Sequence, residues 1–390
     1  LADAFARART LLDRTKLYLV RISANIARGA LTEAIAIAKP VLRELGHDYP
    51  ERPTRVHALL RLAALQWRLR NTPVEALEAL PPMTDPRQLA AMSIGERIGG
   101  AALFVQPALL PLMILKGVEA SLKYGHTDAS LTAYASYGMI LACKLGQVER
   151  GQAFGELALR LTERLPVKSI AGRVLHIHSA LVRHWAEPLH ACLAPLRQAF
   201  ELCLDHGDFE YAVLAATVYA TNSLDASVPL DQLADDIAGL LATARTLNQG
   251  PLVHYLECDL QAALNFLGRS ADPSRLAGPV YDLEQRLPDH EAAGDRSLAL
   301  AARATQIRLS YLFGRADLAL PMADAALADI DAHQGMYCNV SELLFDALVR
   351  LACVTGVTPR QRRRLLRQAA RHQALLKRWA KANPVNFLNK

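Results

Sequence analysis

The chain has 390 residues, 52% of them hydrophobic and 21% charged, and this composition excludes disorder as its main state. Abundant alanine and leucine with few aromatic residues favour packed helices over sheets. The net charge of +6 suggests a nucleic-acid partner, but ten basic residues and no acidic ones lie after residue 359. The rest of the chain is slightly acidic, so the basic balance is a property of the tail alone.

A helix–turn–helix pattern recurs along the chain. An apolar helix leads into a short turn with glycine, and the second helix has a small residue five positions later. In tetratricopeptide repeats a small residue is needed where the second helix closely crosses the first. The clearest units, in chain order, are residues 16–45 around Gly29, 131–165 around Gly146 and 298–330 around Gly314.

Weaker units fill the intervals between these three. They are residues 55–70 with a second helix after 71–73, 170–184 with 187–205, 209–224 with 230–247, and 253–267 with a following short helix. A hairpin of this kind has an apolar face too wide to bury alone, so several must stack. The pattern predicts an all-α fold, a tetratricopeptide-like (TPR-like) α-solenoid of antiparallel helical hairpins with a right-handed superhelix.

We assign residues 1–355 to this helical repeat array and residues 356–390 to a basic C-terminal capping or linker helix that leads to a following domain. The tail helix is expected at 359–382, where an apolar set opposes a dense arginine face. That set is Leu365, Leu366, Ala369, Leu375, Leu376 and Trp379.

Signatures of catalysis are missing from the sequence. It contains no G-x-x-x-x-G-K-[ST] loop, no G-x-G-x-x-G turn after a strand, no H-E-x-x-H pair and no G-x-S-x-G elbow. Together with a repeat fold, this favours a protein that binds and transmits. We therefore expect no enzymatic activity and no cofactor.

The six cysteines form no C-x-x-C pair, which indicates neither a zinc ribbon nor a redox motif and fits a reducing cytosol. The most apolar stretch, residues 98–115, contains glycine and proline and falls short of a bilayer span, so we expect it in the core. No basic leader opens the chain, which starts within a helical pattern as a piece of a longer protein would. We expect a cytoplasmic location.

Four histidines, His176, His178, His184 and His190, are close together in the sequence. Positions two apart on a helix point about 200° apart, so His176 and His178 cannot hold one metal ion from the same face. We interpret the four as histidines on helix surfaces or between hairpins, and we expect no metal site there.

Tetratricopeptide arrays usually bind partners on the concave face, which the first helix of each hairpin lines. The register of the units, with Ala191 as the close-packing residue of the 170–205 unit, gives these candidates: Lys16, Arg173, His176, Arg183, Arg308 and Tyr311. Their basic character would suit an acidic peptide or an anionic small molecule. The alternative is an ordinary solvated helix face.

The tail carries a second basic group, made of Arg362, Arg363, Arg364, Arg367 and Arg371. Nucleic acid or an acidic membrane could bind such a face. We prefer a connecting helix whose charge faces water or an acidic neighbour, and we expect neither nucleic acid nor membrane as a partner.

Five stretches carry a family resemblance: LPPMTDPRQLAAM at 80–92, FVQPALLPLMILKGVEASLKYGHT at 104–127, AYASYGMILACKLGQVERGQAFGELALRL at 133–161, EAAGDRSLA at 291–299 and RRRLLRQAARHQALLKRWAKANPVNFLNK at 362–390. Together they resemble the helical-repeat region of large bacterial signalling proteins. Those proteins join a serine/threonine-kinase-like domain and a STAND-type (AAA-like) NTPase to GAF, histidine kinase or diguanylate cyclase modules.

The resemblance implies a segment placed after the NTPase and before the output module, where an inducer or partner is sensed. The family's kinase, nucleotide-binding and phospho-acceptor residues are not in this chain. We therefore expect a non-catalytic sensor and scaffold whose partners are the other domains of its polypeptide and a partner protein or small-molecule inducer. The alternative is a structural module for dimerisation or protein interaction without a small ligand.

Overall fold

The computed structural model describes residues 2–165, 168–247 and 249–388, and their regular structure is helical apart from two isolated β-bridges. The predicted all-α class is therefore confirmed. The chain divides into two compact units, Leu1–Val167 and Lys168–Lys390. This division falls inside the range assigned to one array, and the tail belongs to the second unit. The last two tail residues, 389 and 390, lie outside the described residues.

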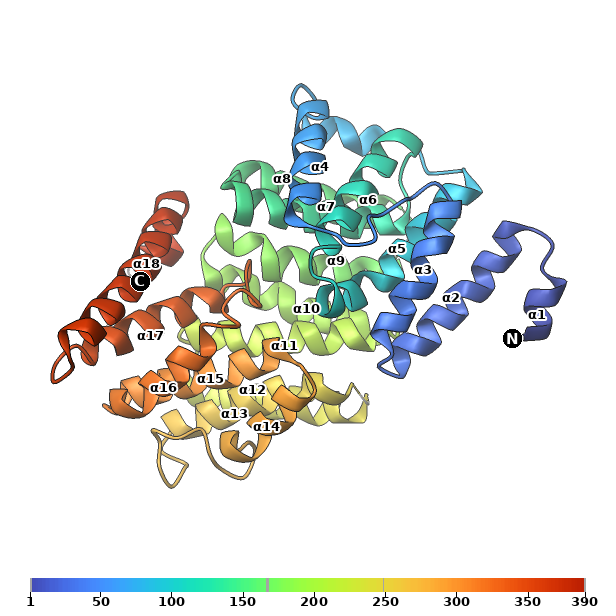
Figure 1. Ribbon diagram of the computed structural model, residues 1–390. Coiled ribbons are helices and arrows are strands. Elements are labelled where there is room, and N and C mark those ends of the chain that lie inside the picture. Colours follow the sequence, from blue (N-terminus) through green and yellow to red (C-terminus); the bar gives the residue numbers. More distant parts are fainter. Residues whose placement is uncertain (1, 166–167, 248, 389–390) are drawn as a thin grey trace. The chain divides into compact units, whose positions relative to one another are not determined.

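The first unit consists of helices that pack mainly against their neighbours in sequence, such as α2 against α3 and α7 against α8 (Figure 1). Its elements are α1 (Ala2–Arg7), α2 (Leu11–Ala27), α3 (Leu31–Glu44), α4 (Arg55–Arg68), the 3₁₀ turn η1 (Val74–Ala79), α5 (Pro86–Val105), α6 (Leu110–Tyr124), α7 (Asp128–Met139), the π turn η2 (Ile140–Lys144) and α8 (Val148–Arg164).

The close crossing predicted for the unit around Gly146 is present between α7 and α8. A Cβ atom added to Gly151 would lie 2.6 Å from the Gly138 carbonyl oxygen, and one added to Gly138 would lie 2.5 Å from the Gly151 carbonyl oxygen. Gly146 forms the turn with φ 66°, a conformation that favours glycine. The small residues thus let the two backbones touch.

The prediction of a second helix after residues 71–73 is wrong. Only the short turn η1 forms there, and α4 instead contacts α6. Pro81 and Pro82 follow this turn, and proline both removes a backbone donor and disfavours helix at the residue before it. The helix α4 therefore lacks the hairpin partner that the sequence pattern had indicated.

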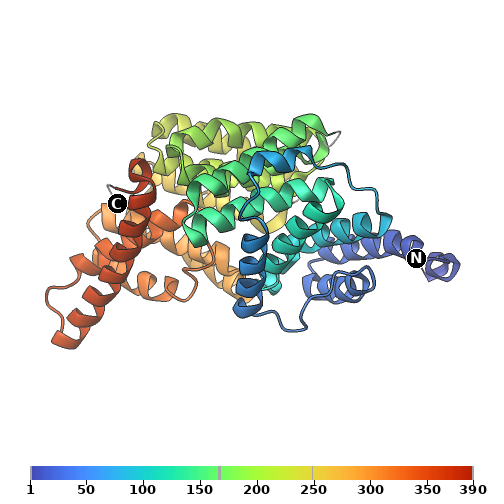
Figure 2. The same cartoon turned by 90° about the horizontal axis from the view of Figure 1, so that it is seen from above.

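The second unit has the same sequential packing, and its alternate helices α9, α11, α13, α15 and α17 also contact one another in succession. Its elements are α9 (Lys168–Leu181), η3 (Arg183–Trp185), η4 (Leu189–Cys192), α10 (Leu193–Asp205), α11 (Phe209–Asp225), α12 (Leu230–Thr246), η5 (Gly250–Leu252), α13 (Val253–Phe266), α14 (Leu283–Ala292), α15 (Arg296–Leu312), α16 (Ala316–Ala326), α17 (Cys338–Ala352), α18 (Pro359–Ala382) and α19 (Pro384–Phe387). Figure 2 shows α17 and α18 side by side at the red end of the chain.

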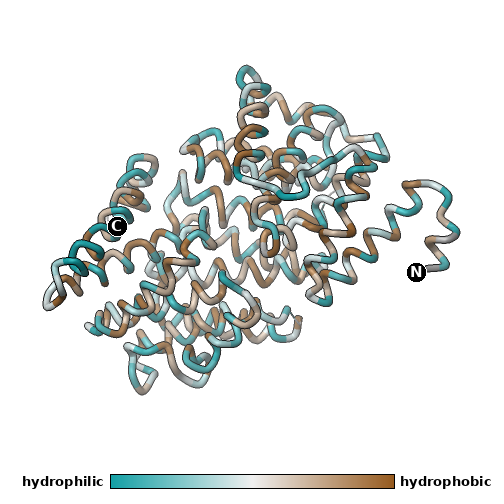
Figure 3. Tube along the Cα trace, viewed as in Figure 1, coloured by the Kyte–Doolittle hydropathy of each residue, from teal (hydrophilic) through white to brown (hydrophobic). Residues whose placement is uncertain are grey.

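Hydrophobic and hydrophilic residues alternate along most helices in Figure 3, as amphipathic helices around a core require. Two details of the predicted hairpins are wrong. The unit around Gly314 was expected to stay helical to residue 330, but α16 ends at Ala326. The crossing expected at Ala191 lies instead at Gly172, where an added Cβ would meet the Cys203 backbone nitrogen at 2.8 Å.

The tail helix forms as α18 over the predicted residues, and Thr358 caps it in a capping box with Gln361. The side chains of Leu365, Ala369, Leu376 and Trp379 are buried as expected, whereas Leu366 is 40% exposed. In the part of the chain that the structure describes, we find no helix with both the length and the apolarity to cross a bilayer.

Candidate functional site

The predicted concave residues lie in both units, so they form no single site within one unit. Lys16 is exposed on α2 of the first unit. The remaining five belong to the second unit, where Arg173 and His176 lie on α9, Arg183 lies on η3, and Arg308 and Tyr311 lie on α15.

The arginines at the start of the second unit already have acidic partners. The Arg173 guanidinium donates to Asp208 at 2.9 Å and lies over the Tyr211 ring, 4.3 Å from its centroid. Arg183 donates to Glu187 at 2.9 Å, one helical turn away. An anionic ligand would have to compete with these carboxylates for both guanidinium groups.

The histidine-rich segment is mostly internal. The side chains of His176, His178 and His184 are buried, whereas His190 is exposed. Burial lowers the pKa of His176 and of His178 to about 4 and that of His184 to about 3, so all three are neutral at pH 7. The His176 ring packs edge-on against Tyr211 at 5.7 Å between centroids.

Arg308 stands at a junction of three helices that are far apart in sequence. Its guanidinium donates to Asp225 at the end of α11 at 2.9 Å, and Ser341 of α17 donates to the same carboxylate at 2.8 Å. The Arg308 group also lies within 6 Å of the ring centroids of Phe266 and Phe345. We call Asp225, Arg308 and Ser341 the polar node, because it links α11, α15 and α17 directly.

Two more side chains of the second unit, the predicted Tyr311 and the nearby Asp259, also make specific contacts. Tyr311 packs edge-on against Phe345 with 6.0 Å between centroids. Asp259 of α13 accepts a hydrogen bond from Thr221 at 2.7 Å, and burial raises its pKa to about 7. The alternate helices therefore meet through hydrogen bonds and ion pairs between side chains rather than through an open charged face.

The end of the chain returns to the start of the second unit. The Asn386 side-chain nitrogen donates to the carbonyl oxygens of His184 and Glu187, both at 2.7 Å, and its oxygen accepts from the Leu189 backbone nitrogen at 2.9 Å. Asn383 also donates to His184 O at 3.2 Å. These bonds join segments nearly 200 positions apart in the sequence.

Aromatic side chains surround the same contact. The Phe387 ring packs against Trp185 and Tyr337, with centroids 5.4 and 6.0 Å apart, and Trp185 meets Trp379 at 5.5 Å. We call Asn383, Asn386 and Phe387 the C-terminal clasp. Buried hydrogen bonds and packed rings together fix the end of the chain to η3 and η4.

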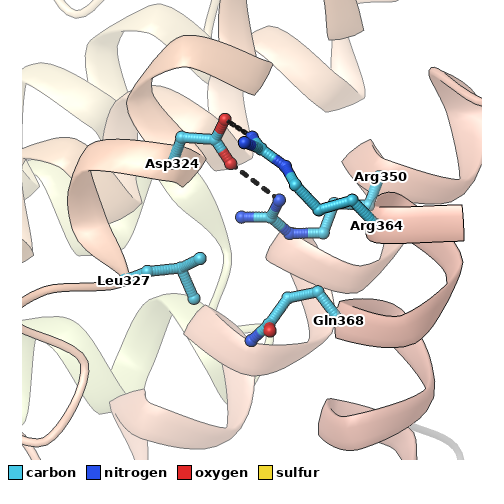
Figure 4. A pocket seen from close by; sticks show the side chains of 5 residues that line it. All are labelled: Asp324, Leu327, Arg350, Arg364 and Gln368. Carbon is cyan, nitrogen blue, oxygen red and sulfur yellow. Dashed lines mark hydrogen bonds and ion pairs between the residues drawn. The ribbon is translucent and has the colours of Figure 1, made fainter. Parts of the chain in front are cut away.

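A cleft of about 320 Å³ lies where α16, α17 and α18 meet, lined by Asp324, Leu327, Arg350, Arg364 and Gln368 (Figure 4). Arg350 is buried, donates twice to Asp346 at 2.7 and 2.8 Å, and contacts Asp324 at 2.8 Å. Arg364 of the tail pairs with the same Asp324. The charges of Arg350, Arg364, Asp324 and Asp346 therefore balance, and their ion pairs hold α18 against α16 and α17.

The other predicted tail residues face outward. Arg362, Arg363, Arg367 and Arg371 are exposed, and within the described part of the chain no carboxylate lies within ion-pairing distance of them. Arg371 donates to Gln368 at 3.5 Å. The tail therefore presents an exposed basic face, as expected, with Arg364 as its anchor to α16.

Two further features were not found by sequence reasoning. One is an apolar stripe on α4 formed by Val56, Leu59, Leu60 and Trp67, each at least 61% exposed. Its helical spacing was visible, but residues 55–70 were assigned to a helical hairpin. The other is a group of metal-binding residue types, His333, Cys338 and Glu342, whose ligand atoms lie within 4.8 Å of one another. Only the four-residue spacing of Cys338 and Glu342 along a helix could have indicated it.

Comparison with known proteins gives a distant and partial similarity. No protein-family model matches this chain. Over 126 residues, 32% of the chain, it is 28% identical to the hybrid signal transduction histidine kinase G of Dictyostelium discoideum. The chain covers 4% of that protein's length. The similarity links this helical protein to signal-transduction kinase proteins and goes no further.

Proposed function

We propose that this chain is a non-catalytic sensor and scaffold segment of a larger signalling protein, built as a TPR-like stack of helical hairpins. It would bind an inducer or a partner protein and pass the effect to adjoining NTPase and output domains. The partial similarity to a signalling protein of which the chain covers only 4% supports a role as one segment among several.

The packing of the second unit supports the repeat architecture. The helices α9, α11, α13, α15 and α17 contact one another in succession, and all but α13 also contact the helix that follows, as repeats do when they bury a continuous core. In such a stack small changes of packing angle add along the array. A ligand can drive the change only as far as it prefers one arrangement over another.

The C-terminal clasp is the observation that carries the proposal. Asn386 ties the end of the chain to His184 O, Glu187 O and Leu189 N in the first hairpin of the unit. The polar node joins α11 to α15 and α17 in the same unit. A rearrangement that moves η3 and η4 away from α19 would break the clasp, which supports a role for the clasp as a relay.

Native mass spectrometry of the protein as purified from cells, with a thermal-shift screen of sugars, acyl compounds and nucleotides, tests the proposal. A co-purifying mass or a compound that raises the melting temperature is expected. Hydrogen exchange with that compound should then change at residues 183–192 as well as at the binding site. A ligand-free species with no shift and unaltered exchange would reject sensing of a small inducer.

The α4 stripe favours a second candidate, a structural module for protein interaction. Val56, Leu59, Leu60 and Trp67 follow helical spacing and are exposed together, and contiguous apolar surface of this kind is typical of interfaces. Light scattering after size-exclusion chromatography should then detect a dimer or partner complex that Leu60→Lys abolishes. Val385→Lys, at another exposed apolar side chain, is the matched control.

A further inference from the structure

Three side chains with metal-ligating atoms meet at the start of α17. Cys338 and Glu342 are four positions apart on this helix, so they share a face one turn apart. His333 comes from the turns at residues 327–337 that precede the helix. The ligand atoms of all three lie within 4.8 Å of one another, and His333 and Glu342 are buried.

The imidazole and the carboxylate of this group are held in place by neighbours. His333 Nδ1 lies 2.5 Å from Glu342 Oε1, and its other ring nitrogen, Nε2, lies 2.9 Å from the Ser297 hydroxyl oxygen. The Asn339 side-chain nitrogen donates to Glu342 Oε2 at 3.0 Å and to Ile330 O at 3.1 Å. One atom of each group therefore faces the cluster while the other is fixed by a second contact.

We propose that His333, Cys338 and Glu342 form a zinc-binding site. A thiolate, an imidazole and a carboxylate are all ligands that Zn²⁺ accepts, whereas Mg²⁺ and Ca²⁺ prefer oxygen alone. The thiolate and the carboxylate together balance the charge of the ion. The inference is independent of the proposed sensor function.

The hydrogen bonds that surround the three ligands match those found around zinc sites. A metal-bound histidine almost always directs its second ring nitrogen to a hydrogen-bond acceptor, and Ser297 provides one here. Asn339 orients the carboxylate in the same way. The alternative arrangement is an ion pair between His333 and Glu342 with the Cys338 thiol hydrogen-bonded to the imidazole, whereas a metal ion would bind all three side chains directly.

Three protein ligands leave the fourth tetrahedral position of Zn²⁺ for water or a small ligand. Cys338 is the least buried member of the cluster. The site would pin the turns before α17 to the helix that also carries Ser341 of the polar node. Its occupancy would stiffen that junction.

Titration of the whole chain with Co²⁺, a spectroscopic probe for zinc sites, tests the assignment. One equivalent should produce a thiolate-to-cobalt charge-transfer band, and Zn²⁺ should displace the cobalt and abolish the band. Elemental analysis after dialysis against zinc should give one ion per chain. Ser297→Ala should weaken binding by about 10- to 100-fold, because it removes an outer contact of the ligating histidine.

Variants separate this site from adventitious binding. Cys338→Ser should eliminate the band, and Glu342→Gln, which keeps the side chain's shape, should greatly weaken zinc binding without unfolding the protein. Cys353→Ser, at a partly exposed cysteine outside the cluster, should change nothing. No band at one equivalent, or a band that survives both Cys338→Ser and Glu342→Gln, would overturn the proposal.

Discussion

The crossing of α7 and α8 gives a sharp test of why this chain needs small residues at fixed positions. Changing Gly151 to Ala places a Cβ 2.6 Å from the Gly138 carbonyl oxygen and 3.1 Å from the Ala142 backbone nitrogen. Both neighbours are backbone atoms and cannot rotate away. The two helices must therefore separate along their contact.

The size of the stability change on Gly151→Ala follows from two opposing effects. Overpacking of a close contact costs about 1–3 kcal/mol, whereas alanine is favoured over glycine within a helix by about 0.5–1 kcal/mol. Gly151→Ala should therefore lower the stability of the α7–α8 hairpin by about 1 kcal/mol at the middle of both ranges, and by at most about 2.5 kcal/mol. Gly99→Ala is the matched control, because an added Cβ at Gly99 of α5 meets no atom within 4 Å and should stabilise.

Hydrogen exchange of peptides from α7 and α8 measures the local opening free energy, which suits a chain of two compact units better than one global transition. The double change of Gly138 and Gly151 to Ala should cost less than the sum of the single changes, since the first already separates the helices. The steric argument would be refuted if Gly151→Ala stabilised the hairpin as Gly99→Ala does.

Two further predictions concern the second unit. Because burial raises the pKa of Asp259 to about 7, above its unfolded value near 3.9, the folded state retains a proton that the unfolded chain has lost between these pH values. This group's contribution to stability should fall as pH rises from about 4 to about 7, by up to about 1.4 kcal/mol per unit, and Asp259→Asn should remove that slope from urea titrations; identical slopes would contradict the assignment. Asn386→Ala leaves the carbonyls of His184 and Glu187 and the Leu189 amide without this partner, so it should cost about 1–3 kcal/mol and speed exchange at residues 183–192. Val385→Ala, at an exposed side chain, should leave exchange there unaltered, and equal effects of the two changes would contradict the clasp.

Local patterns predicted the helices well where glycine turns and small residues mark them. Gly146 and Gly151 identified a hairpin because each has a specific steric reason to be small. The same patterns failed after α4, where Pro81 and Pro82 prevented a second helix. They also misplaced the crossing of α9 and α10, because the turns η3 and η4 shift the register between those helices.

The candidate site was less accessible to sequence reasoning because its parts are distant in the chain. Arg308 was expected on a binding face, and the sequence gives no indication that Asp225, 83 positions earlier, accepts a hydrogen bond from it. Likewise, nothing in the sequence around Asn386 indicates that its side chain forms hydrogen bonds with the backbone of His184 and Leu189. Pairings of this kind are decided by the stacking of whole hairpins, which local periodicity does not encode.

These pairings bear on which partner the protein would bind. An anion at Arg173, Arg183 or Arg308 would have to compete with a carboxylate already in place, and displacing it would leave a partly buried charge without its partner. The stripe on α4 and the outward face of α18 require no such displacement. A partner that covers one of these surfaces therefore need not break an existing ion pair, whereas a small anion at the predicted concave residues must compete with one.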